Sequence, residues 1–295
     1  MNAPLLAAAR PGVLLASALA LASPALAADT VVRRDIEYAR VGETSLQLDL
    51  YLPPESKPPA PLLIYVHGGA WRGGSKKDVP IAALTAQGFA IASVEYRLTP
   101  VAPFPANVHD LKAAVRFLRA KAGEFGCDPK RFAIVGSSAG GHLAALVGVS
   151  NGHKELEGEV GAHRGVSSDV QAIVSFYGAA NLQTILSQST PHGLNMRVPA
   201  LQLLLGGQPE EKPALAKLAS PVAHVDAHDP PLLLLHGDAD PQMPIEQSRE
   251  LHAAYVKAKR PVEFVVLPGS VHGGKEFYDA TRLALVKEFL DKHLR

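Results

Sequence analysis

Residues 132–149 read FAIVGSSAGGHLAALVGV, and this stretch decides the fold. It opens with a continuous apolar run, 132–135, typical of a strand that is buried on both faces of a parallel sheet. The run passes through a G-x-S-x-G pattern into an apolar helical segment, 142–149. A strand, a tight turn between glycines and a helix place the serine of the pattern at the apex of the turn, where its hydroxyl is accessible. The sequence therefore predicts that Ser138 is a nucleophile.

The residues beside this serine have predictable roles. Ser137 lies one position too early to occupy the apex of the turn. Ala139 opens the helix, so its backbone N–H has no partner within the helix and faces the reaction centre. We predict that this N–H stabilises negative charge that develops on a substrate oxygen.

A second glycine-rich loop follows another buried strand. The apolar run 61–66 ends at the sequence HGGAW, which begins at His67. Glycine allows the backbone to approach a substrate closely, so we predict that the N–H groups of Gly69 and Ala70 are further oxyanion donors. His67 is expected to hold the loop through hydrogen bonds. Trp71 either lines the substrate pocket or packs in the interior.

Two more apolar runs, 231–235 and 262–267, end in polar loops that read HGDADP and PGSVHGG. Loops at the carboxyl ends of parallel strands converge on one site. An imidazole can take the serine proton and return it to a leaving group, while a carboxylate fixes its tautomer. We predict His272 as the general base and Asp240 as the orienting acid. Asp238 is the competing acid, and we interpret it as a turn-forming residue.

Strands and helices alternate along the chain, which predicts an α/β fold with a mainly parallel central sheet flanked by helices. Two intervals, 151–168 and 182–213, break the alternation and are predicted to be small cap insertions over the carboxyl ends of the strands, where they would shape the substrate site. The predicted strands are 31–38, 46–51, 61–66, 89–94, 131–135, 171–176, 231–235 and 262–267, and the predicted helices are 80–87, 108–122, 142–149 and 277–294.

Several other residues are expected to be structural. Arg97 and Asp110 are predicted to pair and to tie the loop after one strand to the next helix. The single cysteine, Cys127, cannot form an internal disulfide and is expected to be partly buried. The histidines outside the motifs above are expected at the surface.

The N-terminal segment, 1–27, has the pattern of a signal peptide. One arginine precedes an apolar run that ends in Ala25-Leu26-Ala27, which predicts cleavage after Ala27 and a single catalytic domain over 28–295. Pro24 interrupts the run, which is short for a bilayer span, so no stable membrane insertion is expected. An uncleaved N-terminal anchor is the alternative. We expect a secreted or periplasmic protein of bacterial type.

Composition restricts the classes of partner. The net charge is +1, with 29 Lys and Arg against 28 Asp and Glu, and no run of like charges forms a basic stripe. A nucleic-acid partner is therefore not expected. No Cys and His spacing resembles a zinc site, so neither a metal nor a cofactor is expected.

The chain from about residue 31 to its end resembles the α/β-hydrolase esterases with an HGG-x-W oxyanion loop, and most closely the bifunctional feruloyl and acetylxylan esterase-like group. The resemblance implies that Ser138, Asp240 and His272 form the triad and that Gly69, Ala70 and Ala139 supply the oxyanion donors. It rests on 67–71 with 73–74, 95–98, 104–106 with Asp110, 136–141, 220–221, 236–240 with 247–248, and 272–274.

The function implied is that of a serine carboxylic-ester hydrolase acting through an acyl-enzyme, on a small-molecule ester or an ester linked to a polysaccharide. Acetyl and feruloyl groups of plant polysaccharide suit a secreted enzyme, and a general short-chain carboxylesterase suits the sequence equally well. Members of this group often have a third small residue or a glycine at the position of Ala70 and an acidic residue near Asn181. These two differences bear on substrate choice. An amide hydrolase of the arylformamidase or peptidase type and a catalytically inactive binding module are the alternatives. The sequence does not predict an oligomeric state.

Overall fold

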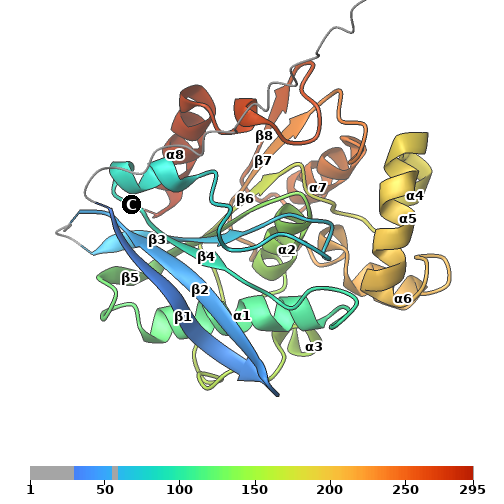
Figure 1. Ribbon diagram of the computed structural model, residues 1–295. Helices are drawn as coiled ribbons and strands as arrows, with labels where there is room; N and C mark the ends of the chain where they lie inside the picture. Colours follow the sequence, from blue (N-terminus) through green and yellow to red (C-terminus); the bar gives the residue numbers. More distant parts are fainter. Residues whose placement is uncertain (1–29, 55–58, 295) are drawn as a thin grey trace, which may run out of the picture.

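The computed structural model describes residues 30–54 and 59–294 (Figure 1). The predicted signal peptide, 1–27, lies outside the described residues. The described chain forms an eight-stranded sheet in the order β1-β2-β4-β3-β5-β6-β7-β8. Its strands are β1 Val31–Val41, β2 Thr44–Leu52, β3 Ala60–Val66, β4 Ala90–Val94, β5 Cys127–Ser137, β6 Ala172–Phe176, β7 Leu232–Gly237 and β8 Val262–Leu267.

Most strand pairs in this sheet are parallel. Only β2 runs opposite to its neighbours, β1 and β4, while the six strands from β4 to β8 all run in the same direction. The carboxyl ends of β5, β7 and β8 therefore lie at one edge, where their loops can meet. The predicted fold, a mainly parallel sheet flanked by helices, is confirmed.

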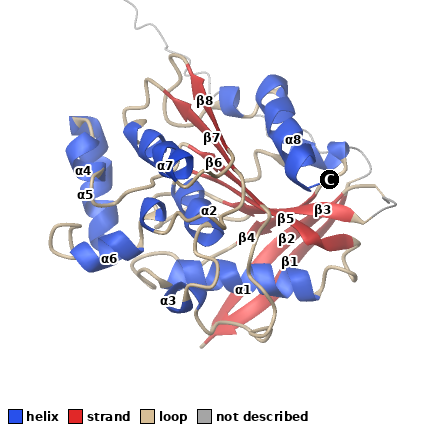
Figure 2. Cartoon of the chain, turned by 180° about the vertical axis from the view of Figure 1, so that it is seen from behind, coloured by secondary structure: helices blue, strands red, loops and turns tan. Residues whose placement is uncertain are grey.

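The helices cover both faces of the sheet (Figures 1 and 2). The longer ones are α1 Ala106–Ala120, α2 Ala139–Gly148, α5 Pro191–Leu205, α7 Glu246–Lys257 and α8 Ala280–Leu294. The shorter ones are η1 Ala82–Gln87, α3 Lys154–Glu157, α4 Ile185–Gln188, α6 Pro213–Leu218, η2 Pro221–Ala223 and η3 Lys275–Phe277.

The buried strand β3 shows how the two faces are filled. Alternate side chains of a strand point to opposite faces. Leu62 and Ile64 join the core that contains residues of α1, α2 and α7, whereas Leu63 and Tyr65 join the core that contains residues of α8. Because both faces are covered, every residue of β3 is buried, as its continuous apolar sequence predicts.

The interval 151–168 does not cover the carboxyl ends of the strands, so that prediction is wrong. It packs along α1 through buried cations: Lys112 and Arg116 both bind Glu157. Further along, Arg119 donates to the carbonyls of residues 167 and 169. Basic side chains of α1 thus bind the carboxylate of Glu157 and backbone carbonyls at the end of this segment.

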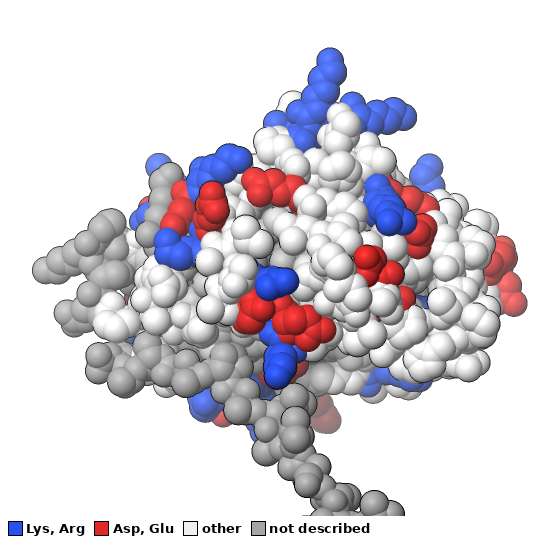
Figure 3. All heavy atoms as spheres, turned by 90° about the horizontal axis from the view of Figure 1, so that it is seen from above, with Lys and Arg blue, Asp and Glu red and all other residues white. Residues whose placement is uncertain are grey.

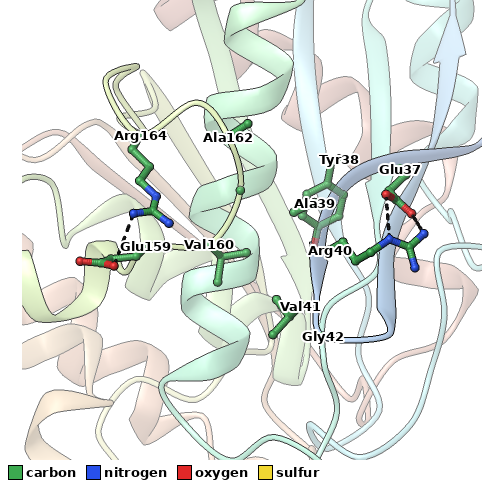
Figure 4. Close-up of a pocket in the computed structure, with 11 residues that line it drawn as sticks. Glu37, Tyr38, Ala39, Arg40, Val41, Gly42, Glu159, Val160, Ala162 and Arg164 are labelled. Carbon is green, nitrogen blue, oxygen red and sulfur yellow. Dashed lines mark hydrogen bonds and ion pairs between the residues drawn. The ribbon is translucent and has the colours of Figure 1, made fainter.

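Beside the same interval, a surface hollow opens between the end of β1 and residues 159–164 (Figure 4). Its lining contains Glu37, Arg40, Glu159 and Arg164 and none of the predicted catalytic residues.

The interval 182–213 does lie beside the loops at the carboxyl ends of the strands. It forms α4 and α5 and leads into α6. Thr190 donates to the carbonyl of Pro241, just after β7. The carbonyl of Leu204 accepts from the N–H of Phe104, in the loop after β4. The interval is therefore helical, and it adjoins the predicted acid, Asp240.

The surface has no dominant charge on the face shown in Figure 3, where acidic and basic side chains are interspersed. Across the described residues, no helix combines the length and the hydropathy that a membrane crossing requires. Cys127 is buried and has a free thiol.

Candidate active site

Ser138 occupies a strained turn between β5 and α2. Its φ of 54° and ψ of −119° are rare for a residue with a side chain, and such strain is typical of nucleophile turns. A Cβ on Gly136 would lie 2.2 Å from the carbonyl oxygen of Gly140, and one on Gly140 would lie 2.0 Å from that of Val66. The two glycines of G-x-S-x-G are therefore required by the close approach of backbone segments.

The structure brings the three predicted triad residues together. Ser138 Oγ lies 2.8 Å from His272 Nε2, and His272 Nδ1 lies 2.6 Å from Asp240 Oδ2. The ionised carboxylate can only accept, so Nδ1 carries a proton and donates it to Asp240. Nε2 is then free to accept from the serine hydroxyl. This is the tautomer that a general base requires.

Asp240 is held as a carboxylate. Burial alone would raise the pKa of Asp240, but hydrogen bonds from His236 and His272 and from the N–H of Met243 hold this pKa below its usual value. Its second oxygen, Oδ1, accepts from the N–H groups of Gln242 and Met243 at 2.8 and 2.9 Å. The acid is thus fixed in place and charged throughout the neutral range.

Asp238, the competing acid, lies elsewhere in the loop. It is exposed, and its Oδ1 accepts from the N–H of Gly269 at 2.6 Å, as expected of a turn-forming residue. His236 supports the loop after β7 from the interior of the protein. Its Nδ1 lies 2.7 Å from Ser248 Oγ, and its Nε2 lies 3.0 Å from the carbonyl of Met243. His236 is completely buried, and sequence reasoning missed this supporting role.

The predicted oxyanion donors have free N–H groups. Within the described residues, no hydrogen bond uses the backbone N–H of Gly69, Ala70 or Ala139. The HGGAW loop turns sharply, because Gly69 and Ala70 both have positive φ. A Cβ on Gly68 would meet the carbonyl oxygen of Ser137 at 3.0 Å and the Cβ of Ser138 at 3.3 Å, so this loop lies directly against the nucleophile turn.

His67 and Trp71 hold this loop from the interior. His67 Nδ1 lies 2.8 Å from the carbonyl of Gly68, and its ring stacks on that of Tyr96 at 4.6 Å. The indole of Trp71 is completely buried and donates to Nδ1 of His142 at 3.1 Å. Trp71 therefore packs in the interior, and the alternative role in the pocket wall is wrong.

His142 on α2 was expected at the surface, but it is completely buried. Because Nδ1 accepts from Trp71, Nε2 carries the proton and donates to the carbonyl of Ala219 at 2.7 Å. Burial lowers the pKa of His142 to about 4, so the ring is neutral at pH 7. It links the oxyanion loop, the nucleophile helix and the segment before η2.

A group of hydroxyls lies behind the triad. Tyr65 and Ser137 are joined at 2.6 Å, as are Tyr177 and Tyr278. The ring of Tyr177 meets that of His272 edge to face, 4.9 Å away. Ser137 is thus bound on the inner side of the turn, away from the apex. Sequence reasoning missed Tyr177, which follows an ordinary apolar strand without any motif.

The predicted pair of Arg97 and Asp110 is confirmed. Two guanidinium nitrogens of Arg97 bind the carboxylate of Asp110 at 2.7 to 3.1 Å, and the backbone N–H of Arg97 adds a further bond at 2.9 Å. Asn181, one of the two departures noted in the sequence, donates a hydrogen bond from its side-chain amide to Glu250 at 2.6 Å.

In the described part of the chain, no group of three or more His, Cys, Asp or Glu is placed to hold a metal ion.

Comparison with known proteins gives consistent matches. Esterase LipC of Mycobacterium tuberculosis is 33% identical over 219 residues, which are 73% of this chain and 53% of that protein. Esterase LipQ of the same organism is 32% identical over 245 residues, 81% of this chain and 56% of that protein. The chain spans about half the length of these curated relatives.

Solved structures match over a larger share of their length. A truncated carbohydrate esterase from gut microbiota has a TM-score of 0.81 at 31% identity, covering 91% of this chain and 98% of that one. The acetyl ester-xyloside bifunctional hydrolase of Caldicellulosiruptor lactoaceticus has a TM-score of 0.72 at 26% identity, covering 85% and 89%. The BD-FAE family model matches residues 48–255. With the α/β fold and this site geometry, that match shows that the chain belongs to the BD-FAE family of α/β-hydrolases.

Proposed function

We propose that this protein is a carboxylic-ester hydrolase that works through an acyl-enzyme on Ser138. The observation that carries the proposal is the continuous relay of 2.8 Å from Ser138 to His272 and 2.6 Å from His272 to Asp240. Such a relay activates a hydroxyl that would otherwise be a weak nucleophile.

In the first half of the reaction, Ser138 Oγ attacks the ester carbonyl while its proton moves to Nε2 of His272. The charged Asp240 stabilises the resulting imidazolium. The carbonyl oxygen becomes an oxyanion, which the N–H groups of Gly69, Ala70 and Ala139 are proposed to bind. As the tetrahedral intermediate collapses, the bond to the alcohol breaks and His272 gives its proton to the departing alcohol oxygen.

In the second half, water replaces the alcohol. His272 takes a proton from the water as its oxygen attacks the acyl-serine carbonyl. The second tetrahedral intermediate then releases the carboxylic acid, and the proton returns to Ser138 Oγ. The reaction therefore consumes one water and restores the enzyme.

For the substrate, we propose acetyl or feruloyl esters of carbohydrate. The support comes from similarity to the carbohydrate esterase and to the acetyl ester-xyloside hydrolase described above, both of which cover most of this chain. A general short-chain ester is the alternative within the same chemistry. A catalytically inactive module is disfavoured by the assembled relay.

The test is hydrolysis of p-nitrophenyl esters from acetate to octanoate, of methyl ferulate and of acetylated xylan. Ser138→Ala should abolish turnover, whereas the matched variant Ser137→Ala, one residue away, should retain it. Turnover of acetylated xylan or methyl ferulate would support the carbohydrate substrate, and turnover of p-nitrophenyl esters alone would favour the general esterase. Full activity in Ser138→Ala, or no hydrolysis of any ester by the wild type, would contradict the proposal, and the latter result would direct attention to amides.

A further inference from the structure

Arg197 on α5 is a buried cation that has no anionic partner among the described residues. Its side chain is 2% exposed. Its Nε donates to the carbonyl of Gln242 at 3.2 Å. Nη1 is buried with no hydrogen-bond partner among the described residues, and no carboxylate of theirs lies within ion-pair distance of this guanidinium. Buried charges in proteins are normally paired, so this one calls for an explanation.

Arg197 lies beside the triad acid. Gln242, whose carbonyl accepts from Arg197, donates its own N–H to Asp240 Oδ1 at 2.8 Å. Thr190 caps the first turn of α5 and also donates to the carbonyl of Pro241. The helix is therefore fixed against the acid loop at two points, and the guanidinium lies beside the loop that holds Asp240.

A second guanidinium belongs to Arg72, whose backbone N–H donates to the carbonyl of Gly69 at 3.0 Å. Arg72 follows the oxyanion loop, is exposed, and makes no side-chain hydrogen bond or ion pair with the described residues. The positive charge of Arg72 disfavours the charged form of Arg197, whereas the negative charge of Asp240 favours that form. Burial lowers the pKa of Arg197 to about 10, so the group still carries its charge at pH 7. With Asp240 already bound to His272, two cations and one anion leave one positive charge uncompensated.

We propose that Arg197 and Arg72 form a subsite for a carboxylate carried by the ester substrate. The inference rests on the proposed esterase function and specifies its substrate class: esters that bear a second, ionised carboxyl group in the acyl or the alcohol part. A guanidinium offers a planar fork of donors that matches a carboxylate. A single carboxylate also balances the one uncompensated charge, which a doubly charged phosphate would exceed.

The test compares pairs of esters of similar shape, one anionic and one neutral. On the alcohol side, the pair is 4-acetoxybenzoate and its neutral methyl ester. On the acyl side, the pair is monoethyl succinate and ethyl butyrate, followed by pH-stat titration. For each pair, the ratio of kcat/KM for the anionic ester to that for the neutral ester is measured in wild type, Arg197→Gln, Arg72→Gln and Arg164→Gln.

We expect the ratio for one of the two pairs to fall about tenfold in Arg197→Gln, because a charge-assisted hydrogen bond to the substrate is lost. The pair affected identifies the part of the ester that carries the carboxylate. Arg72→Gln should lower the same ratio by a smaller factor, because this exposed charge is screened. Added salt should lower the wild-type ratio as well.

Arg164→Gln is the control: it removes the same charge from an exposed residue beside the distant hollow of Figure 4. The ratio should remain at its wild-type value. If Arg197→Gln lowers kcat/KM for anionic and neutral esters equally, Arg197 only holds the acid loop and the subsite is overturned. If Arg197→Gln does not fold, Arg72→Gln and the salt dependence decide. The subsite is overturned if the ratio of kcat/KM is unchanged in Arg72→Gln and added salt does not lower the wild-type ratio. Failure of the wild type on every neutral ester would instead contradict the esterase function itself.

Discussion

His142 shows how one side chain can couple stability to pH in this site. Burial lowers the pKa of this imidazole to about 4 in the folded protein, whereas the unfolded chain has the ordinary pKa of 6.5. Between these values the unfolded state binds a proton that the folded state excludes. The stability that depends on the neutral ring is therefore present above pH 6.5 and is lost as the pH falls towards 4.

We expect His142→Gln to destabilise the protein by about 2 kcal/mol at pH 8, since it disturbs two buried hydrogen bonds. At pH 5 the difference from wild type should be clearly smaller, because the wild type has lost part of its advantage. Urea unfolding at both pH values measures this, with the exposed His192→Gln as control. An equal difference at the two pH values would contradict the proton linkage.

Gly140 allows a second prediction at the scale of the residue. A Cβ at this position would lie 2.0 Å from the carbonyl oxygen of Val66, so backbone must move. We expect Gly140→Ala to destabilise the protein by about 3 kcal/mol and to lower esterase activity by displacing Ser138. Gly123→Ala is the matched control, because a Cβ there meets nothing within 4 Å. Thermal unfolding that is the same for both variants would show that the turn adapts.

The triad residues could be predicted from sequence because each follows an apolar strand and carries a distinctive neighbourhood of glycines. Asp240 could be distinguished from Asp238 by the expected role of the latter in a turn. His142 and Arg197 could not be predicted in the same way. Their burial and hydrogen bonds depend on segments far away in the chain, Ala219 and Gln242, and no local pattern records those contacts.

At the scale of elements, Glu157 fixes the segment 151–168 to α1. It pairs with Lys112 and Arg116, both of which are buried. We expect Glu157→Gln to destabilise the protein by about 2 kcal/mol, because it leaves two buried cations without their carboxylate; the partial exposure of Glu157 reduces the effect. Activity on a short ester should be retained at temperatures where the variant is folded.

The control for this prediction is Glu159→Gln, two residues away. The side chain of Glu159 is 86% exposed and pairs only loosely with Arg164, at 3.4 Å, so its loss should leave thermal unfolding unchanged. A drop in activity of the folded Glu157→Gln variant, with no change in stability, would restore a substrate-shaping role for this segment.

The strands were easier to predict than the helices. Each buried strand is a short apolar run, and this local pattern predicts a strand without any knowledge of the segments that pack against it. Helix α7 was missed because two of its four buried residues, Gln247 and Ser248, are polar and disguise the helical period. The amide of Gln247 can be buried because its oxygen accepts hydrogen bonds from the N–H groups of residues 180 and 181. Helix α5 was missed because it contains Pro199, and proline inside a helix is unusual.

At the scale of the whole molecule, the proposed export depends on residues 1–27, which the structure does not describe. We propose that a bacterial host exports the full chain and removes this segment after Ala27. Mass spectrometry of the exported protein should then give an N-terminus at Ala28. Ala25→Arg, which replaces the first small residue of the cleavage pattern, should block processing. A full-length wild-type product in the membrane fraction would favour the uncleaved anchor.

The buried contact between Trp71 and His142 makes the site visible to spectroscopy. The chain has a single tryptophan, so its fluorescence reports on one place, the loop that contains Gly69 and Ala70. A dry indole emits at short wavelength, and emission shifts to the red when water reaches the ring. During a urea titration, a red shift that precedes the loss of circular dichroism would reveal local opening of the site, and coincident transitions would show that the loop and the sheet unfold as one cooperative unit.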